Sequence, residues 1–255
     1  MILQRKNNTV YAAFSNLAAH PGVFHAIFTR RTDSGDSLNT GANSGSDMSS
    51  VKSARKAVKK CMQASELIFL KQIHGSEVVT IKSRNDAKSA AGKPPAADAV
   101  ISKSPGTGLV IQAADCQAVM LYDPVKHAAA NIHSGWRGSI SNIIGACVKA
   151  MKENFSTDPA DLAAGIGPSL GPCCAEFTNY KKEIPEPFWI YRDSQNRFDF
   201  WQASTDQLKA AGVKEKNIEL SNICTMCNPH LFFSYRAEKT AKRFATVIGI
   251  KGNQI

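Results

Sequence analysis

Short apolar runs recur along the chain and predict most of its strands. These runs cover residues 25–29, 67–73, 77–81, 99–101, 109–112, 118–122, 128–133 and 244–250. Polar residues, glycines and prolines separate them into short groups rather than one regular series. The pattern therefore favours a mixed sheet over a single repeating strand-and-helix unit.

Helical periodicity appears in three segments, and each predicts a helix that packs on the sheet. In the first, the apolar positions are Val51, Ala54, Ala57, Val58 and Cys61, and the basic positions opposite them are Lys52, Arg55, Lys56, Lys59 and Lys60. Two further helices are predicted from Gly138 to about residue 154 and over residues 201–211. Residues 32–50 and 87–97, which are rich in turn-forming residue types, are predicted to be loops.

These elements predict one α+β domain over residues 1–255, with a mixed β-sheet core flanked by helices. The chain has 255 residues, of which 43% are hydrophobic and 20% charged, and this composition is typical of a globular protein. Its apolar runs are too short for a membrane span, and its first residues lack the apolar stretch of a secretory signal. Seven cysteines, an odd number, favour reduced thiols. We therefore expect a cytoplasmic protein without a membrane partner, as a monomer or small homo-oligomer.

The net charge of +10 favours anionic partners. The sequence carries no zinc-finger, recognition-helix or aromatic-rich sheet signature beside this charge, so nucleic acid is not an expected partner. The basic residues between positions 52 and 60 are interpreted as the solvated face of a helix.

Three segments carry residue types suited to metal chemistry at or between strand ends. They contain His74 before a turn glycine, Cys116 between two apolar runs, and His133 at the end of another run. Two imidazoles and a thiolate would fill three positions of a tetrahedral zinc and leave the fourth open, as in catalytic sites. The wide spacing leaves two alternatives open, a small buried Cys116 and a hydrogen-bonded His74 in the core.

The segment after His133 also suggests an anion site. Gly135 and Gly138 flank the predicted start of a helix, whose free N–H groups attract anions, and Arg137 adds a cation beside them. The alternative is that Trp136 packs in the core and Arg137 makes a structural ion pair.

The remaining cysteines form two pairs, the adjacent Cys173 and Cys174 and the Cys-x-x-Cys of Cys224 and Cys227. Adjacent cysteines are poor chelators, and a zinc ribbon requires two Cys-x-x-Cys knuckles. The second pair precedes Asn228-Pro229, which indicates a turn rather than a thioredoxin-like redox motif. Both pairs are therefore interpreted as structural thiols.

Several ordered motifs resemble the YfiH family, also called the laccase-domain or multicopper polyphenol oxidase family. They are KQIHG (71–75), ADAVIS (97–102), AADCQAVMLYDP (113–124), HSGWRG (133–138), GIGPSLGPCC (165–174) and CTMCNPHLFFSYR (224–236). Together with Arg55 upstream, the resemblance runs from about residue 25 to the C-terminus.

The resemblance implies a mixed α/β fold with one metal site, formed by His74, Cys116 and His133. It also implies purine nucleoside phosphorolysis, in which adenosine, inosine, guanosine or methylthioadenosine reacts with phosphate to give the base and a ribose 1-phosphate. Adenosine deamination is associated with the same site. Zinc is the expected metal and copper the alternative, since copper-dependent polyphenol oxidation is an older description of the family.

Beside the metal ligands, Asp115 is the candidate acid–base group, and Arg55 and Arg137 are the candidates for holding phosphate. A hydrolase or amidase with Cys116 as nucleophile is a further alternative, because it would use the same residues. A multicopper cluster is disfavoured, because the chain has only six histidines. The segment 29–39 departs from the family pattern by lacking a glycine pair, which leaves the substrate preference open.

Overall fold

The computed structural model describes residues 1–42 and 47–252 and contains two six-stranded mixed sheets. The first sheet has the order β1 (Ile2–Lys6), β2 (Thr9–Ala13), β3 (Val23–Thr32), β12 (Phe244–Ile250), β7 (Thr107–Ala113) and β4 (Glu66–Phe69). The second has the order β11 (Ile218–Leu220), β10 (Ala163–Ile166), β8 (Gln117–Asp123), β9 (Ala128–Ser134), β6 (Ala99–Ser102) and β5 (Val78–Ile81). The α+β class with flanking helices is confirmed, and the predicted mixed sheet is divided into two.

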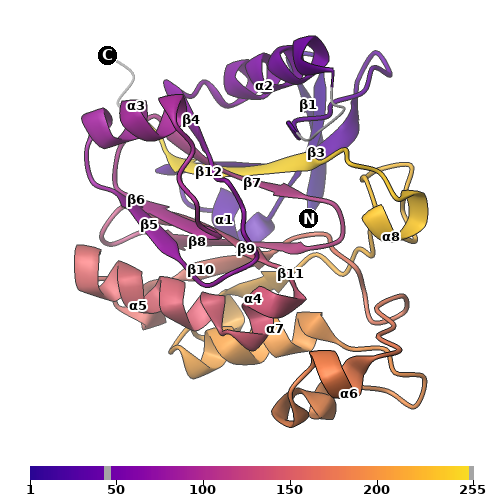
Figure 1. Cartoon of the computed structure of the whole chain (residues 1–255). Coiled ribbons are helices and arrows are strands. Elements are labelled where there is room, and N and C mark those ends of the chain that lie inside the picture. Colours follow the sequence, from indigo (N-terminus) through magenta and orange to yellow (C-terminus); the bar gives the residue numbers. More distant parts are fainter. Residues whose placement is uncertain (43–46, 253–255) are drawn as a thin grey trace.

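The two sheets pack face to face, with helices on both outer faces (Figure 1). Helix α2 (Met48–Met62) covers the first sheet, and α5 (Ile143–Phe155) covers the second, with α7 (Phe200–Ala210) beside it. The remaining helices are short: α1 (Ser15–Ala18), α3 (Arg84–Gly92), α4 (Trp136–Ile140), α6 (Tyr180–Glu183) and α8 (Tyr235–Glu238). Within the described residues, every helix is too short or too polar to span a bilayer.

Strand alternation builds a separate core on each side of each sheet. In β7, Leu109 and Ile111 pack between the sheets, whereas Val110 packs under α2. In β8, Met120 points between the sheets and Val119 points toward α5. The central strands are apolar on both faces because both faces are covered.

The structure corrects several expected boundaries. Residues 84–92 form α3 instead of a loop, because the hydroxyl of Ser83 and the carboxylate of Asp86 form a reciprocal capping box. The helix expected after Gly138 is two helices, α4 and α5, separated at Asn142, whose left-handed backbone and side chain cap α5. The strand expected over 67–73 ends at Phe69. Of the predicted loop 32–50, residues 43–46 lie outside the described residues.

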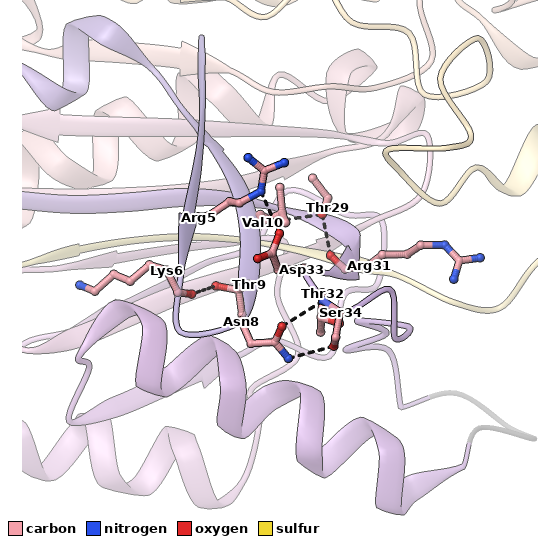
Figure 2. Close-up of polar contacts among 10 residues, drawn as sticks. All are labelled: Arg5, Lys6, Asn8, Thr9, Val10, Thr29, Arg31, Thr32, Asp33 and Ser34. Atoms are coloured by element: carbon pink, nitrogen blue, oxygen red, sulfur yellow. Dashed lines mark hydrogen bonds and ion pairs between the residues drawn. The ribbon is translucent and has the colours of Figure 1, made fainter.

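The hairpin of β1 and β2, which the apolar pattern missed, holds the segment that departs from the family pattern (Figure 2). Asn8 donates to the hydroxyl of Ser34 at 3.0 Å and accepts from its backbone N–H at 3.0 Å. The guanidinium of Arg5 pairs with Asp33 at 2.8 Å. Asp33 and Ser34 are thus bound to the hairpin.

A buried histidine makes stability depend on pH. The backbone N–H of Phe14 donates to Nε2 of His25 at 2.9 Å, and burial lowers the pKa of His25 from 6.5 to about 4. Between these values the unfolded chain binds the proton more readily than the folded chain does, so stability falls as pH falls. At about 1.4 kcal/mol per pKa unit, the loss at pH 4 is roughly 3 kcal/mol.

Denaturant unfolding of the wild type and of His25→Gln from pH 7 to pH 4 tests this prediction. Glutamine keeps an acceptor but does not titrate, so its stability curve is expected to be flatter by this amount. Parallel curves for the two proteins would contradict the assignment.

Candidate metal centre and its pocket

The three predicted ligands meet at one edge of the two packed sheets. Strand β9 pairs antiparallel with both β8 and β6, so its C-terminal end, carrying His133, lies where β8 and β6 begin. Cys116 immediately precedes β8, and His74 lies on the segment that follows β4. The ligand atoms of His74, Cys116 and His133 lie within 4.8 Å of one another, and the two imidazole rings are perpendicular at 4.8 Å between centroids.

Asp98, a residue that the sequence reasoning did not single out, orients two of these ligands. It is fully buried, and its Oδ1 accepts from Nδ1 of His133 at 2.8 Å and from the backbone N–H of His74 at 2.9 Å. Its Oδ2 accepts from the backbone N–H groups of Ile73 at 3.2 Å and Gly75 at 2.7 Å. With Nδ1 donating to Asp98, the Nε2 atom of His133 is left as the ligand.

The electrostatics of the cluster favour a thiolate. Burial disfavours the charged form of Cys116, but the nearby positive charge of His133 and hydrogen bonds from both histidines outweigh it and lower the pKa of Cys116 to about 6. Burial likewise disfavours charged His133, but the Cys116 thiolate and Asp98 raise the pKa of His133 to about 9. A thiolate at neutral pH is the form of cysteine that binds a metal.

The backbone beside His74, Cys116 and His133 has two unusual conformations and one glycine that leaves space next to these side chains. His74 and Asp115 adopt left-handed backbone conformations, with φ of 60° and 85°, which are uncommon for residues other than glycine. A Cβ on Gly135 would lie 3.2 Å from the sulfur of Cys116 and 3.3 Å from Cδ2 of His74. Glycine at this position therefore keeps clear the space that a metal ion on these ligands would need.

The cluster lies in the wall of a pocket of about 750 Å³. Aromatic side chains of Phe69, Trp136, Phe177, Phe200 and Tyr235 contribute to its lining, and its cationic side chains are Lys71, Arg55, Arg236 and Arg243. The pocket thus combines apolar rings, several cations and a metal-type ligand set, which is an arrangement that can bind a flat polar molecule and an anion.

The predicted anion-binding arginines occupy different environments. Arg55 projects from α2 into the pocket wall, where its guanidinium lies 4.0 Å from the ring centroid of Phe69 and donates to the carbonyl of Thr40 at 2.9 Å. Arg137 is exposed and stacks 4.1 Å from the ring of Trp136; in the part of the chain that the structure describes, it is not among the pocket-lining residues. Arg137 lies in the first turn of α4, which has only five residues.

Asp115 lines the pocket, but both of its carboxylate oxygens accept hydrogen bonds from neighbouring segments. The hydroxyl of Thr225 donates to Oδ1 at 2.7 Å, and the backbone N–H of Arg236 donates to Oδ2 at 2.6 Å. Its carbonyl accepts from the N–H of Leu170 at 2.8 Å. Asp115 therefore joins three segments of the pocket wall.

Comparison with known proteins agrees with the motif resemblance. Purine nucleoside phosphorylase YlmD of Geobacillus stearothermophilus is 30% identical over 228 residues, covering 84% of this chain and 83% of that protein. Purine nucleoside phosphorylase YfiH of Escherichia coli is 30% identical over 224 residues, covering 84% and 86%.

The crystal structure of YlmD from Geobacillus stearothermophilus superposes with a TM-score of 0.86 at 24% identity, over 98% of this chain and 99% of that one. A hypothetical protein YfiH of Bacillus licheniformis gives 0.85 at 24% identity, over 98% and 99%. The family described as multi-copper polyphenol oxidoreductase laccase matches residues 24–251. The chain belongs to this family, which includes the YfiH and YlmD proteins.

Proposed function

We propose that the protein is a zinc-dependent purine nucleoside phosphorylase that also deaminates adenosine. The observation that carries the proposal is the convergence of His74, Cys116 and His133 in the wall of a pocket large enough for a nucleoside. Relatives at about 30% identity are named purine nucleoside phosphorylases. Adenosine, inosine, guanosine and methylthioadenosine are the proposed nucleosides, and phosphate is the second substrate.

The donor set fits zinc better than it fits a copper cluster. Imidazole and thiolate suit zinc, and three protein ligands leave one position for a substrate or water. All six histidines lie within the described residues, but only His74 and His133 join this group. Bound zinc would supply a Lewis acid that polarises an oxygen atom or activates water. We expect metal analysis of protein purified without added copper to find about one zinc ion per chain at this site.

The pocket's own residues provide the remaining parts of a phosphorolysis site. Phe177 and Tyr235 offer ring faces and edges against which a purine can pack. Arg55 and Arg236 are the proposed fork-shaped cations for phosphate, and partial burial lowers the pKa of Arg55 from its ordinary value. Asp115 remains the proposed acid–base group, held in place by Thr225 and by the backbone of Arg236.

Replacing Arg55 by alanine is expected to raise the phosphate KM by about tenfold to hundredfold, which corresponds to roughly 1.5–3 kcal/mol for hydrogen bonds to a charged group. Adenosine deamination, which uses water in place of phosphate, should change much less. Steady-state kinetics of both reactions provide the measurement. Arg137→Ala is the matched comparison, and a larger phosphate effect there than at Arg55 would assign phosphate to Arg137.

The proposal is tested by incubating the purified protein with adenosine, with and without phosphate, and separating adenine, inosine and hypoxanthine. Adenine that forms only with phosphate supports phosphorolysis, and inosine that forms without phosphate supports deamination. Absence of turnover for every purine nucleoside would refute the proposal.

A cysteine hydrolase is the second candidate, because Cys116, His133 and Asp98 also resemble a nucleophile, base and orienting carboxylate. Alkylation of Cys116 with iodoacetamide distinguishes the two functions. Protection by zinc but not by nucleoside would favour the metal site, whereas alkylation of zinc-loaded protein at the rate of the metal-free protein would favour the hydrolase.

A further inference from the structure

Two cysteine pairs that lie about fifty residues apart in the sequence form one cluster in the fold. The sulfur atoms of Cys173, Cys174, Cys224 and Cys227 all lie within 4.8 Å of one another. Cys227 Sγ is 3.6 Å from that of Cys173 and 3.5 Å from that of Cys174. Cys224 is buried, whereas Cys173 and Cys227 are exposed, so the cluster reaches the surface.

The backbone explains how adjacent cysteines can face one centre. Ser169 and Cys224 form a parallel bridge, in which the N–H of Ser169 donates to the carbonyl of Ile223 at 3.2 Å and the N–H of Thr225 donates to the carbonyl of Ser169 at 2.9 Å. A tight turn follows, closed by the N–H of Cys174 on the carbonyl of Gly171 at 2.9 Å. The turn brings both cysteines of the first pair against the second pair.

Gly171 allows the close approach of the two segments and adds a hydrogen bond to the cluster. A Cβ at this position would lie 3.1 Å from Cβ of Cys224 and 2.8 Å from the ring of Trp201, so a side chain would collide. The N–H of Gly171 donates to the sulfur of Cys224 at 3.3 Å. Backbone N–H groups directed at sulfur stabilise a thiolate, including a thiolate that binds a metal.

We propose that Cys173, Cys174, Cys224 and Cys227 bind a second, structural zinc ion, separate from the site formed by His74, Cys116 and His133. A tetrahedral zinc with sulfur ligands at about 2.3 Å requires sulfur atoms about 3.8 Å apart, close to the separations observed here. Four protein ligands close the coordination sphere, which is typical of structural rather than catalytic zinc.

A divalent cation would offset half of the charge of four thiolates at this place. On binding, four thiols release four protons to solvent and four zinc–sulfur bonds form, so that the unit carries a charge of about −2. The guanidinium of Arg197, which is paired with Asp193 at 2.7 Å, also donates to the carbonyl of Cys173 at 3.5 Å. A disulfide fits the geometry less well, because its sulfur atoms must approach to about 2.05 Å.

The site would brace the wall of the catalytic pocket. Leu170, Ala175 and Phe177, which line the pocket, flank the first cysteine pair in the sequence. Thr225, inside the second pair, donates to Asp115. The proposed zinc therefore joins the two segments that hold this part of the wall, without contacting the pocket's own metal ligands.

Metal content per chain tests the proposal without any activity assay, so its outcome is independent of the proposed function. Plasma mass spectrometry of protein purified without added metal should give two zinc ions for the wild type. The double variant Cys173→Ser/Cys227→Ser should give one, and its thermal midpoint should fall by several degrees. Cys61→Ala, which removes a buried thiol of α2, is the matched control and should keep two.

Equal zinc content in the wild type and the double variant would overturn the proposal. A mass decrease of two hydrogens that is reversed by reductant, or iron accompanied by acid-labile sulfide, would also overturn it. If the double variant fails to fold, cobalt-substituted His133→Ala protein is used instead. The absorption bands of a cobalt tetrathiolate in that protein would support the second site, and their absence would overturn it.

Discussion

Replacement of His133 by alanine is expected to abolish both phosphorolysis and adenosine deamination, with losses on the order of a thousandfold, or about 4 kcal/mol of transition-state stabilisation. The physical reason is that the donor set falls from three ligands to two, so that Cys116 and His74 alone would hold the metal. In the proposed function both reactions depend on the same metal, so both should fall together.

His127→Ala is the matched control, because His127 lies at the other end of the β8–β9 hairpin and contacts the hydroxyl of Tyr122 at 3.1 Å. This variant should keep both activities and the full metal content. Activity measured with zinc content on the same samples provides the test. A fully active His133→Ala protein would contradict the proposal that a metal bound by His133 takes part in either reaction.

Replacement of Asp98 by asparagine is expected to weaken zinc binding at the His74–Cys116–His133 site by about 10-fold to 100-fold. The Asp98 carboxylate accepts four N–H groups, including that of the His133 ring, whereas an amide presents one oxygen and a competing donor. His133 would lose its fixed tautomer, and the backbone around His74 would lose its anchor.

Asp123→Asn provides the comparison, because Asp123 is equally buried at the opposite end of β8 and caps a turn through the N–H groups of Val125 and Lys126. It should keep zinc affinity even if stability falls. Competition with a chromophoric chelator measures the affinities. Equal zinc affinity in the wild type and in both variants would show that Asp98 does not position the ligands.

The central strands and the three ligands were predictable from sequence for related reasons. Strands β7, β8 and β9 are covered on both faces, so their residues form apolar runs that are visible without a structure. His74, Cys116 and His133 each stand at the end of such a run or beside one, within motifs that resemble a known family.

Strand β1 and helix α3 were not predicted, because the interactions that stabilise them do not depend on a pattern of apolar residues. Strand β1 is exposed along its whole length and is held by pairing with β2. Helix α3 depends on its capping box, whose signal is the Ser83-x-x-Asp86 spacing near a region rich in turn formers. For α3, the spacing of two polar residues was therefore a better signal than the pattern of apolar residues.

Asp98 and the four-cysteine cluster show why long-range contacts limit prediction from sequence. The partners of Asp98 lie 23 to 35 residues away, and its signals are a carboxylate directly before an apolar strand and its place in the motif ADAVIS. The two cysteine pairs are brought together by contacts between distant segments, among them the bridge between Ser169 and Cys224. Sequence spacing alone did not indicate that bridge.

The most direct test of the proposed phosphorolysis is phosphorus NMR of the zinc-loaded protein with inosine and inorganic phosphate. We expect a sugar 1-phosphate resonance that grows in equal amount to the hypoxanthine released. Hypoxanthine without any sugar phosphate would identify a nucleoside hydrolase, and an unchanged spectrum together with unchanged inosine would contradict the proposed activity.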